Sequence, residues 1–430
     1  MTHEAIPPKT GGVQFPRSPE YGRPVRTRVF AGLPREVAVL AAVAFAVAVG
    51  FGVVAPAIPV FARAFGVGET AAGAVISAFA FARLVFALSS GKLVDRFGER
   101  VILATGIGIV AVSSALAGLA QTYVQLLLLR GIGGVGSAMF TVSAVSLLLR
   151  VVAAEHRGRA TGLWQSGFLL GAIAGPAIGG PLTAISLRAP FFVYAGTLAV
   201  AGGIGMVFLS KAELREKPTG DESPAAPRTS LAEALRVSGY RAALVANLGT
   251  GWALFGVRSS LIPLFVVDAL GRSATWTGVG FFVSAAAQGL LLLPVGRFVD
   301  TTGRRPAMII GAAVASASMA LITIESLVVY VIAMTLFGVG AAFLSVAPSA
   351  AVGDVFSGRG GTVVAAFQMS ADLGAVAGPL LAGWIAEQYS FGAAFGVTAG
   401  VLALGVVAAV ASRETRHRAD PDQPAVAPAG

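Results

Sequence analysis

Twelve long apolar stretches constrain this chain more than any other feature of its sequence. A helix that crosses a membrane needs roughly 20 consecutive apolar residues, and each stretch approaches or exceeds that length. Hydrophobic residues make up 56% of the 430, more than a soluble domain could cover with polar surface. The sequence therefore predicts an all-α integral membrane protein with twelve transmembrane helices at residues 37–59, 71–90, 101–120, 124–149, 160–183, 189–209, 242–267, 275–295, 306–324, 327–352, 361–386 and 391–411.

The positive charges predict the orientation of these helices. With six exceptions, the 31 lysines and arginines lie in the terminal segments and in alternate loops. The exceptions are Arg63, Arg188 and Arg272 in the other loops and Arg83, Arg130 and Arg258 inside predicted spans. Because Lys and Arg concentrate in cytoplasmic loops, we expect both termini to be cytoplasmic and the chain to be multi-pass. The net charge of +10 then reflects topology, and we expect no nucleic-acid partner.

Three strings of the first half recur in the second half in the same order. They are FGVVAPAIPVF (51–61) with FGVRSSLIPLF (255–265), GKLVDRFGER (91–100) with GRFVDTTGRR (296–305), and GLWQSGFLLGAIAGPAIGG (162–180) with AAFQMSADLGAVAGPLLAG (365–383). Internal repeats of this kind are common in secondary transporters. We therefore expect two pseudo-symmetric six-helix bundles, at 37–209 and 242–411. A cytoplasmic linker with a short surface helix (210–241) would join them, with disordered cytoplasmic tails at 1–36 and 412–430.

These strings resemble the major facilitator superfamily, and the resemblance runs from about residue 37 to residue 411. GKLVDRFGER resembles the family's signature loop between helices 2 and 3, and the second copy keeps its pattern. RGIGGVGSA, which begins at Arg130, resembles the motif centred on an arginine inside the membrane. GAIAGPAIGG resembles the signature of the antiporter branch, which includes the 12-helix drug:proton antiporters. The resemblance implies the major facilitator fold, with a central cavity that opens alternately to the two sides.

The two signature loops, which we call the latch loops, have a physical rationale. Their residues are Gly91, Asp95, Arg96, Gly98, Arg100, Gly296, Asp300, Gly303, Arg304 and Arg305. A carboxylate is stabilised at the positive N-terminal end of a helix. The resemblance implies that Asp95 meets the helix that begins near Gly361 in the other half, and pseudo-symmetry implies that Asp300 addresses the helix near Gly158. The loops would then hold the cytoplasmic side shut; alternatively, they serve only as topological anchors.

One position departs from the family pattern. The family commonly has an acid at the end of helix 4, whereas this chain has Arg150 there and Asp354 at the repeat-related position. The first latch loop would therefore use Glu155 or lack that bond.

Ionisable groups inside the predicted spans point to function, because each costs about 2.5–3.5 kcal/mol to insert at the membrane centre. Asp372 is the only acid deep in a predicted span, and Arg83 lies at a similar depth in a helix that faces it in the resembled fold. Two interpretations stay open. Asp372 takes up and releases a proton while its contact with Arg83 alternates, or the two form a static ion pair. For Arg130 the resemblance implies a role in proton coupling.

Five residues are candidates to line the cavity. Arg258 either lines it or extends its guanidinium toward the headgroups. Gln165 and Gln368 occupy repeat-related positions beside Trp164 and Phe367. Amide and aromatic side chains together suit an amphiphilic ligand, but the amides could equally bond a neighbouring helix.

The fifth predicted span carries small residues at the spacing of a helix face. Gly171, Gly175 and Gly179, with Gly180, predict close packing against a neighbouring helix, and Pro176 predicts a bend. The antiporter resemblance implies that this packing seals the protein against proton leak.

These observations favour a proton-coupled exporter of small apolar or amphiphilic compounds, of the drug-efflux type, in a bacterial inner membrane. We expect it to act as a monomer without cofactor or metal. The chain has no cysteine and three histidines, all in polar segments, which argues against an enzyme. A carrier of anionic or neutral metabolites or sugars, including a proton-coupled importer, is the alternative, because three embedded arginines outnumber one aspartate. A non-transporting receptor on the same fold would have little use for the latch loops.

Overall fold

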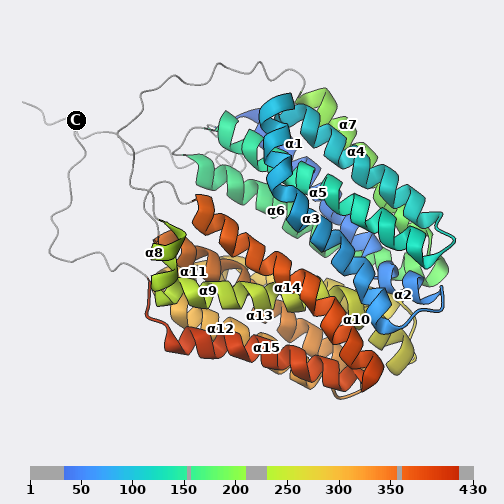
Figure 1. Ribbon diagram of the computed structural model, residues 1–430. Coiled ribbons are helices and arrows are strands. Elements are labelled where there is room, and N and C mark those ends of the chain that lie inside the picture. Colours follow the sequence, from blue (N-terminus) through green and yellow to red (C-terminus); the bar gives the residue numbers. More distant parts are fainter. Residues whose placement is uncertain (1–32, 153–155, 210–229, 356–360, 416–430) are drawn as a thin grey trace, which may run out of the picture.

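The computed structural model describes residues 33–152, 156–209, 230–355 and 361–415, and every regular element in these ranges is a helix (Figure 1). Most of the predicted tails and linker lies outside the described residues. The first bundle comprises α1 (Arg35–Val54), α2 (Ala57–Arg63), α3 (Glu69–Phe97), α4 (Glu99–Gly118), α5 (Tyr123–Val151), α6 (Arg157–Ile185) and α7 (Ala189–Phe208). The second comprises α9 (Ser238–Thr250), η3 (Gly251–Val257), α10 (Arg258–Leu264), η4 (Phe265–Ala269), α11 (Thr275–Thr301), α12 (Arg304–Leu321), α13 (Leu327–Val355), α14 (Gly361–Gln388) and α15 (Phe391–Ala411).

Helix length and composition confirm an integral membrane protein. Within the described ranges, 11 helical runs are long and apolar enough to cross a membrane, α1 with α2 and α9 through η4 each counting as one run. The predicted span at 306–324 corresponds to α12, which packs against α13 and α15. Its 18 residues begin with Arg304 and Arg305, so its apolar part is shorter than that of the others. The predicted all-α class and the twelve-helix architecture are thus confirmed.

The short helix expected in the linker is α8 (Leu231–Arg236). Ser230 accepts a hydrogen bond from the backbone N–H of Glu233, and the Glu233 carboxylate accepts one from the backbone N–H of Ser230. These reciprocal bonds stabilise the first turn, and they lower the pKa of Glu233. A six-residue helix outside the bundles is therefore defined by its cap.

Each bundle packs as a unit, and the two meet mainly along two helix pairs, α3 with α14 and α6 with α11, with α10 also contacting α2 and α3. α1 and α9 begin on one side of the molecule, where α7 and α15 end; we call this the terminal side and its opposite the far side. Figure 1 shows the bundles diverging toward the terminal side and converging near α2 and α10.

Glycines show where the bundles touch. On the far side, a Cβ added to Gly180 of α6 would lie only 2.7 Å from the Cα of Gly278 in α11, and one added to Gly383 of α14 would lie 2.9 Å from the backbone oxygen of Glu69. On the terminal side, a Cβ added to Gly162 or Gly296 would meet nothing within 4 Å. The two bundles are therefore in backbone contact on the far side and apart on the terminal side.

The glycine face of α6 packs against α1. A Cβ at Gly171 would lie 2.6 Å from the backbone oxygen of Phe45, and one at Gly175 would lie 2.5 Å from that of Val49. Gly179 likewise lies against the Val53 backbone. This close approach accounts for the repeated glycines, because no other residue leaves room for the α1 backbone.

The seventh span contains two π-helical segments, η3 and η4, on either side of α10. The predicted span at 242–267 therefore runs to Ala269 but not as a regular α-helix. The backbone at Gly251, the first residue of η3, lies against the Ala371 carbonyl of α14. π-helical turns are rare and frequently occur at functional sites.

Candidate functional site

The central polar contact between the bundles is an ion pair between Arg83 of α3 and Asp372 of α14. Arg83 Nη2 donates to Asp372 Oδ1, and the two side chains are 35% and 18% exposed. One and a half turns toward the far side, Ser77 Oγ donates to the Val376 carbonyl at 2.7 Å. The ion pair thus stands at the terminal-side end of the α3–α14 seam, where contact gives way to the space between the bundles.

A second polar group closes the far-side end of the same seam. The backbone N–H and the hydroxyl of Thr70 both donate to Oε2 of Glu387, at 3.1 and 2.6 Å. Arg63 lies 3.3 Å from Glu69 in its own bundle and 3.7 Å from Asp268 in the other. We call these five residues the far-side clasp. Glu387 lies at the N-terminal end of α3, where the helix dipole favours a carboxylate.

The sequence did not single out the far-side clasp. The acids lie at the ends of apolar runs, where a solvated carboxylate is ordinary, and nothing in the sequence pairs residues 317 positions apart. Two of its residues, Arg63 and Asp268, flank the far-side loops of opposite bundles. Only the three-dimensional arrangement shows that they meet.

The latch loops are not engaged across the bundles in this structure. Asp95 is exposed, and no described residue forms a hydrogen bond or ion pair with it. Asp300 lies 3.5 Å from Arg304, one turn along in its own bundle. The contacts expected at Gly361 and Gly158 are therefore absent in this conformation, because the bundles are apart on the terminal side.

The glycines that end the two latch loops have a local role. Gly98 and Gly303 have positive φ angles of 82° and 129°, which a residue with a side chain rarely adopts. Each stands between the end of one membrane helix and the start of the next, so it permits the tight reversal that the repeated motif predicts. Gly91 and Gly296 lie within helices, and no atom approaches within 4 Å of a Cβ added to either.

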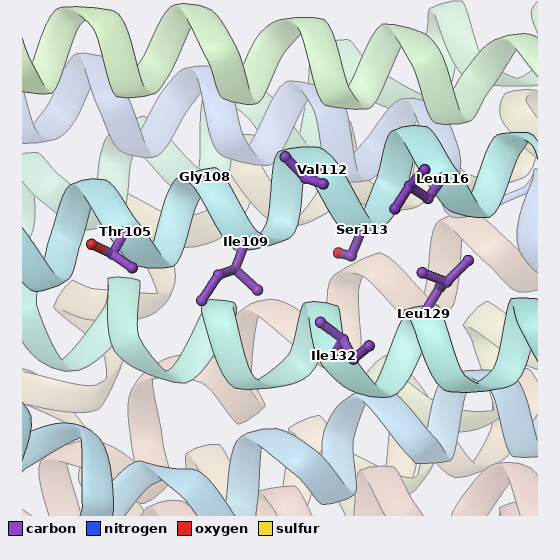
Figure 2. A pocket seen from close by; sticks show the side chains of 8 residues that line it. All are labelled: Thr105, Gly108, Ile109, Val112, Ser113, Leu116, Leu129 and Ile132. Carbon is purple, nitrogen blue, oxygen red and sulfur yellow. The ribbon is translucent and has the colours of Figure 1, made fainter.

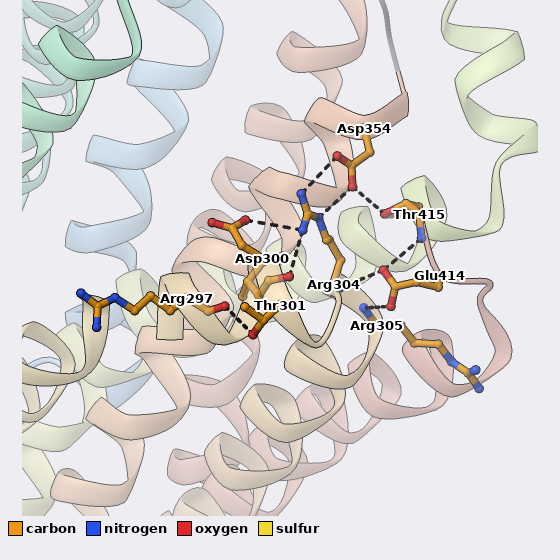
Figure 3. Close-up of polar contacts among 9 residues, drawn as sticks. Arg297, Asp300, Thr301, Arg304, Arg305, Asp354, Glu414 and Thr415 are labelled. Carbon is orange, nitrogen blue, oxygen red and sulfur yellow. Dashed lines mark hydrogen bonds and ion pairs between the residues drawn. The ribbon is translucent and has the colours of Figure 1, made fainter. Parts of the chain in front are cut away.

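Inside each bundle the latch loop is tied to two other helices. Arg304 at the start of α12 bonds Asp354 near the end of α13 at 2.8 Å (Figure 3). Arg305 donates to the Val410 carbonyl near the end of α15 at 2.6 Å. In the first bundle, Arg100 donates to the repeat-related Met206 carbonyl at 3.3 Å. The C-terminal segment adds the Glu414 carboxylate, which accepts from the Arg304 and Arg305 backbone N–H groups.

The structure shows the partner of Arg150, the residue that stands where the family commonly has an acid. Arg150 at the end of α5 bonds Glu99 at the start of α4 at 2.8 Å. In the motif alignment Glu99 corresponds to Arg304, and Arg150 corresponds to Asp354. The two bundles therefore hold the same ion pair at the same place with the charges exchanged. Glu155, the acid considered from the sequence, lies outside the described residues.

Arg130 and Arg258 are enclosed without an acidic partner. The guanidinium of Arg130 lies over the Phe79 ring of α3, and that of Arg258 over the Phe281 ring of α11, each 4.5 Å from the ring centre. Neither forms a hydrogen bond or ion pair with any described residue, and the Nε atom of each is buried without a partner. Cation–π contact offsets only part of the cost of burying such a charge.

The four remaining cavity candidates separate into two pairs. Gln165 and Gln368 are exposed. Each lies four residues, about one turn, before the terminal-side end of the contacts between bundles, at Leu169 of α6 and Asp372 of α14. Both amides therefore share the helix face that borders the space between the bundles.

Trp164 and Phe367 do not lie on that face. Each is 7% exposed and packs in the core of its own bundle. Trp164 stands edge-on to Phe168, with ring centres 5.0 Å apart. The aromatic residues expected to line the cavity are core residues in this structure.

A groove of about 470 Å³ lies elsewhere, between α4 and α5 of the first bundle (Figure 2). Its lining is apolar apart from Thr105 and Ser113. Val112 and Ile132, which also line it, are 62% and 50% exposed on the outside of the bundle. This groove faces the surrounding lipid and is separate from the space between the bundles. Among the described residues, no group of three or more His, Asp or Glu side chains could hold a metal ion.

Comparisons of sequence point to transporters. The profile of the Major Facilitator Superfamily matches residues 40–287 and 253–429. An uncharacterised MFS-type transporter of Methanocaldococcus jannaschii is 25% identical over 384 residues, covering 86% of this chain and 97% of the relative. Multidrug resistance protein 1 of Bacillus subtilis is 29% identical over 164 residues, and quinolone resistance protein NorA of Staphylococcus aureus is 28% identical over 165. Each of these two matches covers 38% of this chain and 42% of the relative.

Solved structures share the fold at low sequence identity. The nucleoside transporter NupG matches with a TM-score of 0.66 and 15% identity, over 87% of this chain and 99% of that one. A POT family transporter in complex with a thioalcohol-conjugated peptide matches with a TM-score of 0.73 and 12% identity, over 89% and 96%. At such identities the likeness concerns the fold alone.

Proposed function

The chain belongs to the major facilitator superfamily of transporters, and we propose that it exports small apolar or amphiphilic compounds in exchange for protons. In this proposal the terminal side is cytoplasmic, the protein lies in a bacterial inner membrane, and a monomer suffices without a cofactor. Its similarity to two drug-resistance proteins over 38% of the chain supports the substrate class.

The observation that carries the proposal is the Arg83–Asp372 ion pair. It joins the two bundles at the place where their contact ends, and it contains the only acid deep within a described span. Protonation of Asp372 would remove the Coulomb attraction between α3 and α14. Protonation of the Asp372 carboxylate can therefore change the free energy of contact between the bundles. Coupling requires such a link between proton binding and conformation.

The conformation described here fits one stage of such a cycle. The far side is closed by the clasp, the terminal side is open, and Asp372 is paired with Arg83. In the proposed cycle this arrangement would be the state that follows proton release to the cytoplasm. A substrate would enter from the cytoplasm beside Gln165 and Gln368. The far side would then open as the α3–α14 seam separates, and Asp372 would take up the next proton from outside.

The latch loops would act at the opposite stage. When the far side opens, the terminal sides of α3 and α14 would approach, and Asp95 would meet the N-terminal end of α14. A carboxylate at that end is stabilised by the helix dipole. Arg130, buried against Phe79 one helix away from the seam, would contribute to coupling by keeping a fixed positive charge near the proton site.

The test is transport in proteoliposomes under an imposed pH gradient, with a cationic, a neutral and an anionic lipophilic dye. We expect Asp372→Asn to lower gradient-driven movement about tenfold or more while dye binding persists. Arg83→Gln should behave similarly, and Arg83→Lys should keep part of the activity. Glu233→Gln, which removes an acid from α8 outside the bundles, is the matched control. If Asp372→Asn moves dye at the parent rate under the pH gradient, Arg83 and Asp372 form a static ion pair without a role in coupling.

A second candidate is a carrier for anionic or neutral metabolites that works as an importer. It is favoured by Arg130 and Arg258, two embedded cations without an acidic partner among the described residues. The same vesicles separate the two functions by direction. An importer would lose uptake when the outside is made alkaline, whereas an exporter would not.

A further inference from the structure

Arg258 differs from the other two embedded arginines in its surroundings. Arg83 has a carboxylate partner. One turn after Arg130, a Cβ added to Gly133 would lie 3.0 Å from the hydroxyl of Ser113, which donates to the Val110 carbonyl and so has a partner of its own. The Arg258 guanidinium lies over a helix that carries hydroxyl groups without a partner.

Two of these hydroxyls belong to α11. Thr277 and Ser284 are 0% and 1% exposed, and the oxygen of each is buried without any hydrogen-bond partner. They lie one turn before and one turn after Phe281, the residue whose ring the Arg258 guanidinium covers at 4.5 Å. Residues three and four apart share a helix face, so both hydroxyls lie on the face that Arg258 contacts. Buried hydroxyls in a folded protein are nearly always bonded, so two unbonded ones on the helix face under an unpaired arginine require an explanation.

Tyr330 of α13 packs against the same part of α11. Its hydroxyl donates to the Trp276 carbonyl at 3.1 Å, one residue before Thr277, and would meet a Cβ added to Gly280. Because that proton is used, Tyr330 is a wall of the site, and the available donors are the guanidinium and the two hydroxyls. These are groups that bind anions, and no carboxylate of the described chain is present to use them.

The position of Arg258 along its span is equally unusual. It is the first residue of α10 and follows the π-helical segment η3 directly. It lies about 16 Å along the helix from the far-side end at Ala269, a depth within the hydrocarbon core. A π-helical segment changes the direction of the side chains that follow it, and such segments occur at functional sites.

We propose that Arg258, Thr277 and Ser284, walled by Phe281 and Tyr330, bind the anionic group of an amphiphilic organic anion. The guanidinium supplies charge and paired N–H donors, the hydroxyls complete the anion's hydrogen bonds, and the apolar body of the ligand lies against the Phe281 side. The inference rests on the proposed function only in treating this region as part of the substrate path. It names the substrate class as organic anions.

The test is equilibrium binding to the purified full chain in zwitterionic lipid nanodiscs, without a pH gradient. The probes are 2-naphthoate and its neutral isostere 2-naphthamide. We expect the parent to prefer the anion about tenfold or more, and Arg258→Gln to lose that preference while naphthamide binding is retained. Arg258→Lys should keep part of the preference. The matched control is Arg188→Gln, an arginine of the first bundle whose guanidinium lies 5.4 Å from the centre of the Phe61 ring, which should keep all of it.

The hydroxyl donors provide an independent variant. Thr277→Val combined with Ser284→Ala leaves the charge in place and should lower the anion preference several-fold, even if Arg258→Gln fails to fold. The proposal is overturned if this double variant or Arg258→Gln keeps the full preference, or if Arg188→Gln loses it equally. A further outcome would overturn it. If sodium chloride, compared with sodium gluconate, raises the melting temperature of the parent but not of Arg258→Gln, and the parent binds naphthoate no better than naphthamide, the site binds an inorganic anion only.

The outcome is separable from that of proton coupling. Binding is measured at equilibrium, so Asp372→Asn should keep the preference for naphthoate whether or not it carries the proton. If Asp372→Asn loses gradient-driven transport but still prefers naphthoate, the result supports both proposals. An absent preference with intact coupling would remove only the anion site.

Discussion

Gly180 of α6 and Gly278 of α11 determine how closely the bundles approach on the far side. With no side chain at either position, backbone meets backbone, and a Cβ at Gly180 would fall 2.7 Å from the Gly278 Cα. A contact that short cannot be absorbed by rotating a side chain. Any larger residue must separate α6 from α11 or leave this conformation less populated.

We therefore expect Gly180→Leu to open the far side. Because the chain contains no cysteine, a single Ser77→Cys reports on the buried α3–α14 seam without background. Labelling of this cysteine by a membrane-impermeant maleimide should rise about fivefold or more in Gly180→Leu. Gly203→Leu in α7 is the control, since a Cβ there meets nothing within 4 Å. Equal labelling of the two variants would contradict the role of the glycine contact.

Single residues also show how far sequence reasoning reaches. Counting turns from the helix ends placed Arg83 and Asp372 at one depth, and the structure pairs them. Their part in proton transfer stays a prediction. The same reasoning failed for Trp164 and Phe367, because neighbours on a helix point about 100° apart. If Gln165 and Gln368 face the space between the bundles, their sequence neighbours must turn into the core.

At the scale of elements, the two latch loops tie the same three helices in each bundle but use exchanged charges. Glu99 bonds Arg150 in the first bundle, where Arg304 bonds Asp354 in the second. The sequence showed the odd arginine at the end of helix 4 but not its partner, since the partner's own change lies 51 residues away. Repeat alignment identifies both positions, and only the structure shows that they are in contact.

We expect Arg150→Asp to destabilise the first bundle and Glu99→Arg with Arg150→Asp to restore most of the loss. The single change places two acids together, whereas the double change reproduces the polarity of the second bundle. A partly exposed ion pair contributes about 1 kcal/mol or less, so the single variant should lose about 2–4 °C in melting temperature. Arg297→Asp, whose side chain bonds no described residue, is the control. A double variant as unstable as the single one would contradict direct pairing.

The π-helical segments of the seventh span were outside the reach of sequence reasoning. Apolar periodicity indicates that a segment is a buried helix, but it does not distinguish a hydrogen bond to the fourth residue from one to the fifth. Here η3 begins at Gly251, the residue that lies against the Ala371 carbonyl. A tertiary contact, absent from local sequence, therefore accompanies the change in helix type.

At the scale of the whole molecule, α3 and α14 carry a carboxylate at each end of their seam. Glu387 meets the N-terminal end of α3 on the far side, and Asp95 is available for the N-terminal end of α14 on the terminal side. The helices are antiparallel, so the acid near the C-terminal end of each lies on the same side of the molecule as the N-terminal end of the other. In the proposed cycle the bundles close on one side while they open on the other, so we expect the two contacts to form at different stages.

Glu387→Gln and Asp95→Asn should therefore shift the conformations in opposite directions. Glu387→Gln weakens the far-side clasp, so we expect longer distances between spin labels at Gln121 and Arg272, two exposed far-side loop positions. Helix-end charge contacts contribute about 0.3–1 kcal/mol, which corresponds to population changes of roughly two- to fivefold.

Asp95→Asn should instead favour the terminal-open state. Spin labels at the exposed positions Phe97 and Thr302 should then keep the longer distance even when substrate is added. A shift of both variants in the same direction would argue that the two carboxylates do not oppose each other.

The exchanged ion pair has a consequence for how the chain folds. Its two halves share a repeat, so the first half could dock its latch loop onto the helix ends of the second during insertion. Such an exchange would place Glu99 beside Asp354 and Arg304 beside Arg150, two like-charged pairs in place of two attractive ones. The reversed polarity therefore makes docking within each half more favourable in free energy than docking onto the other half.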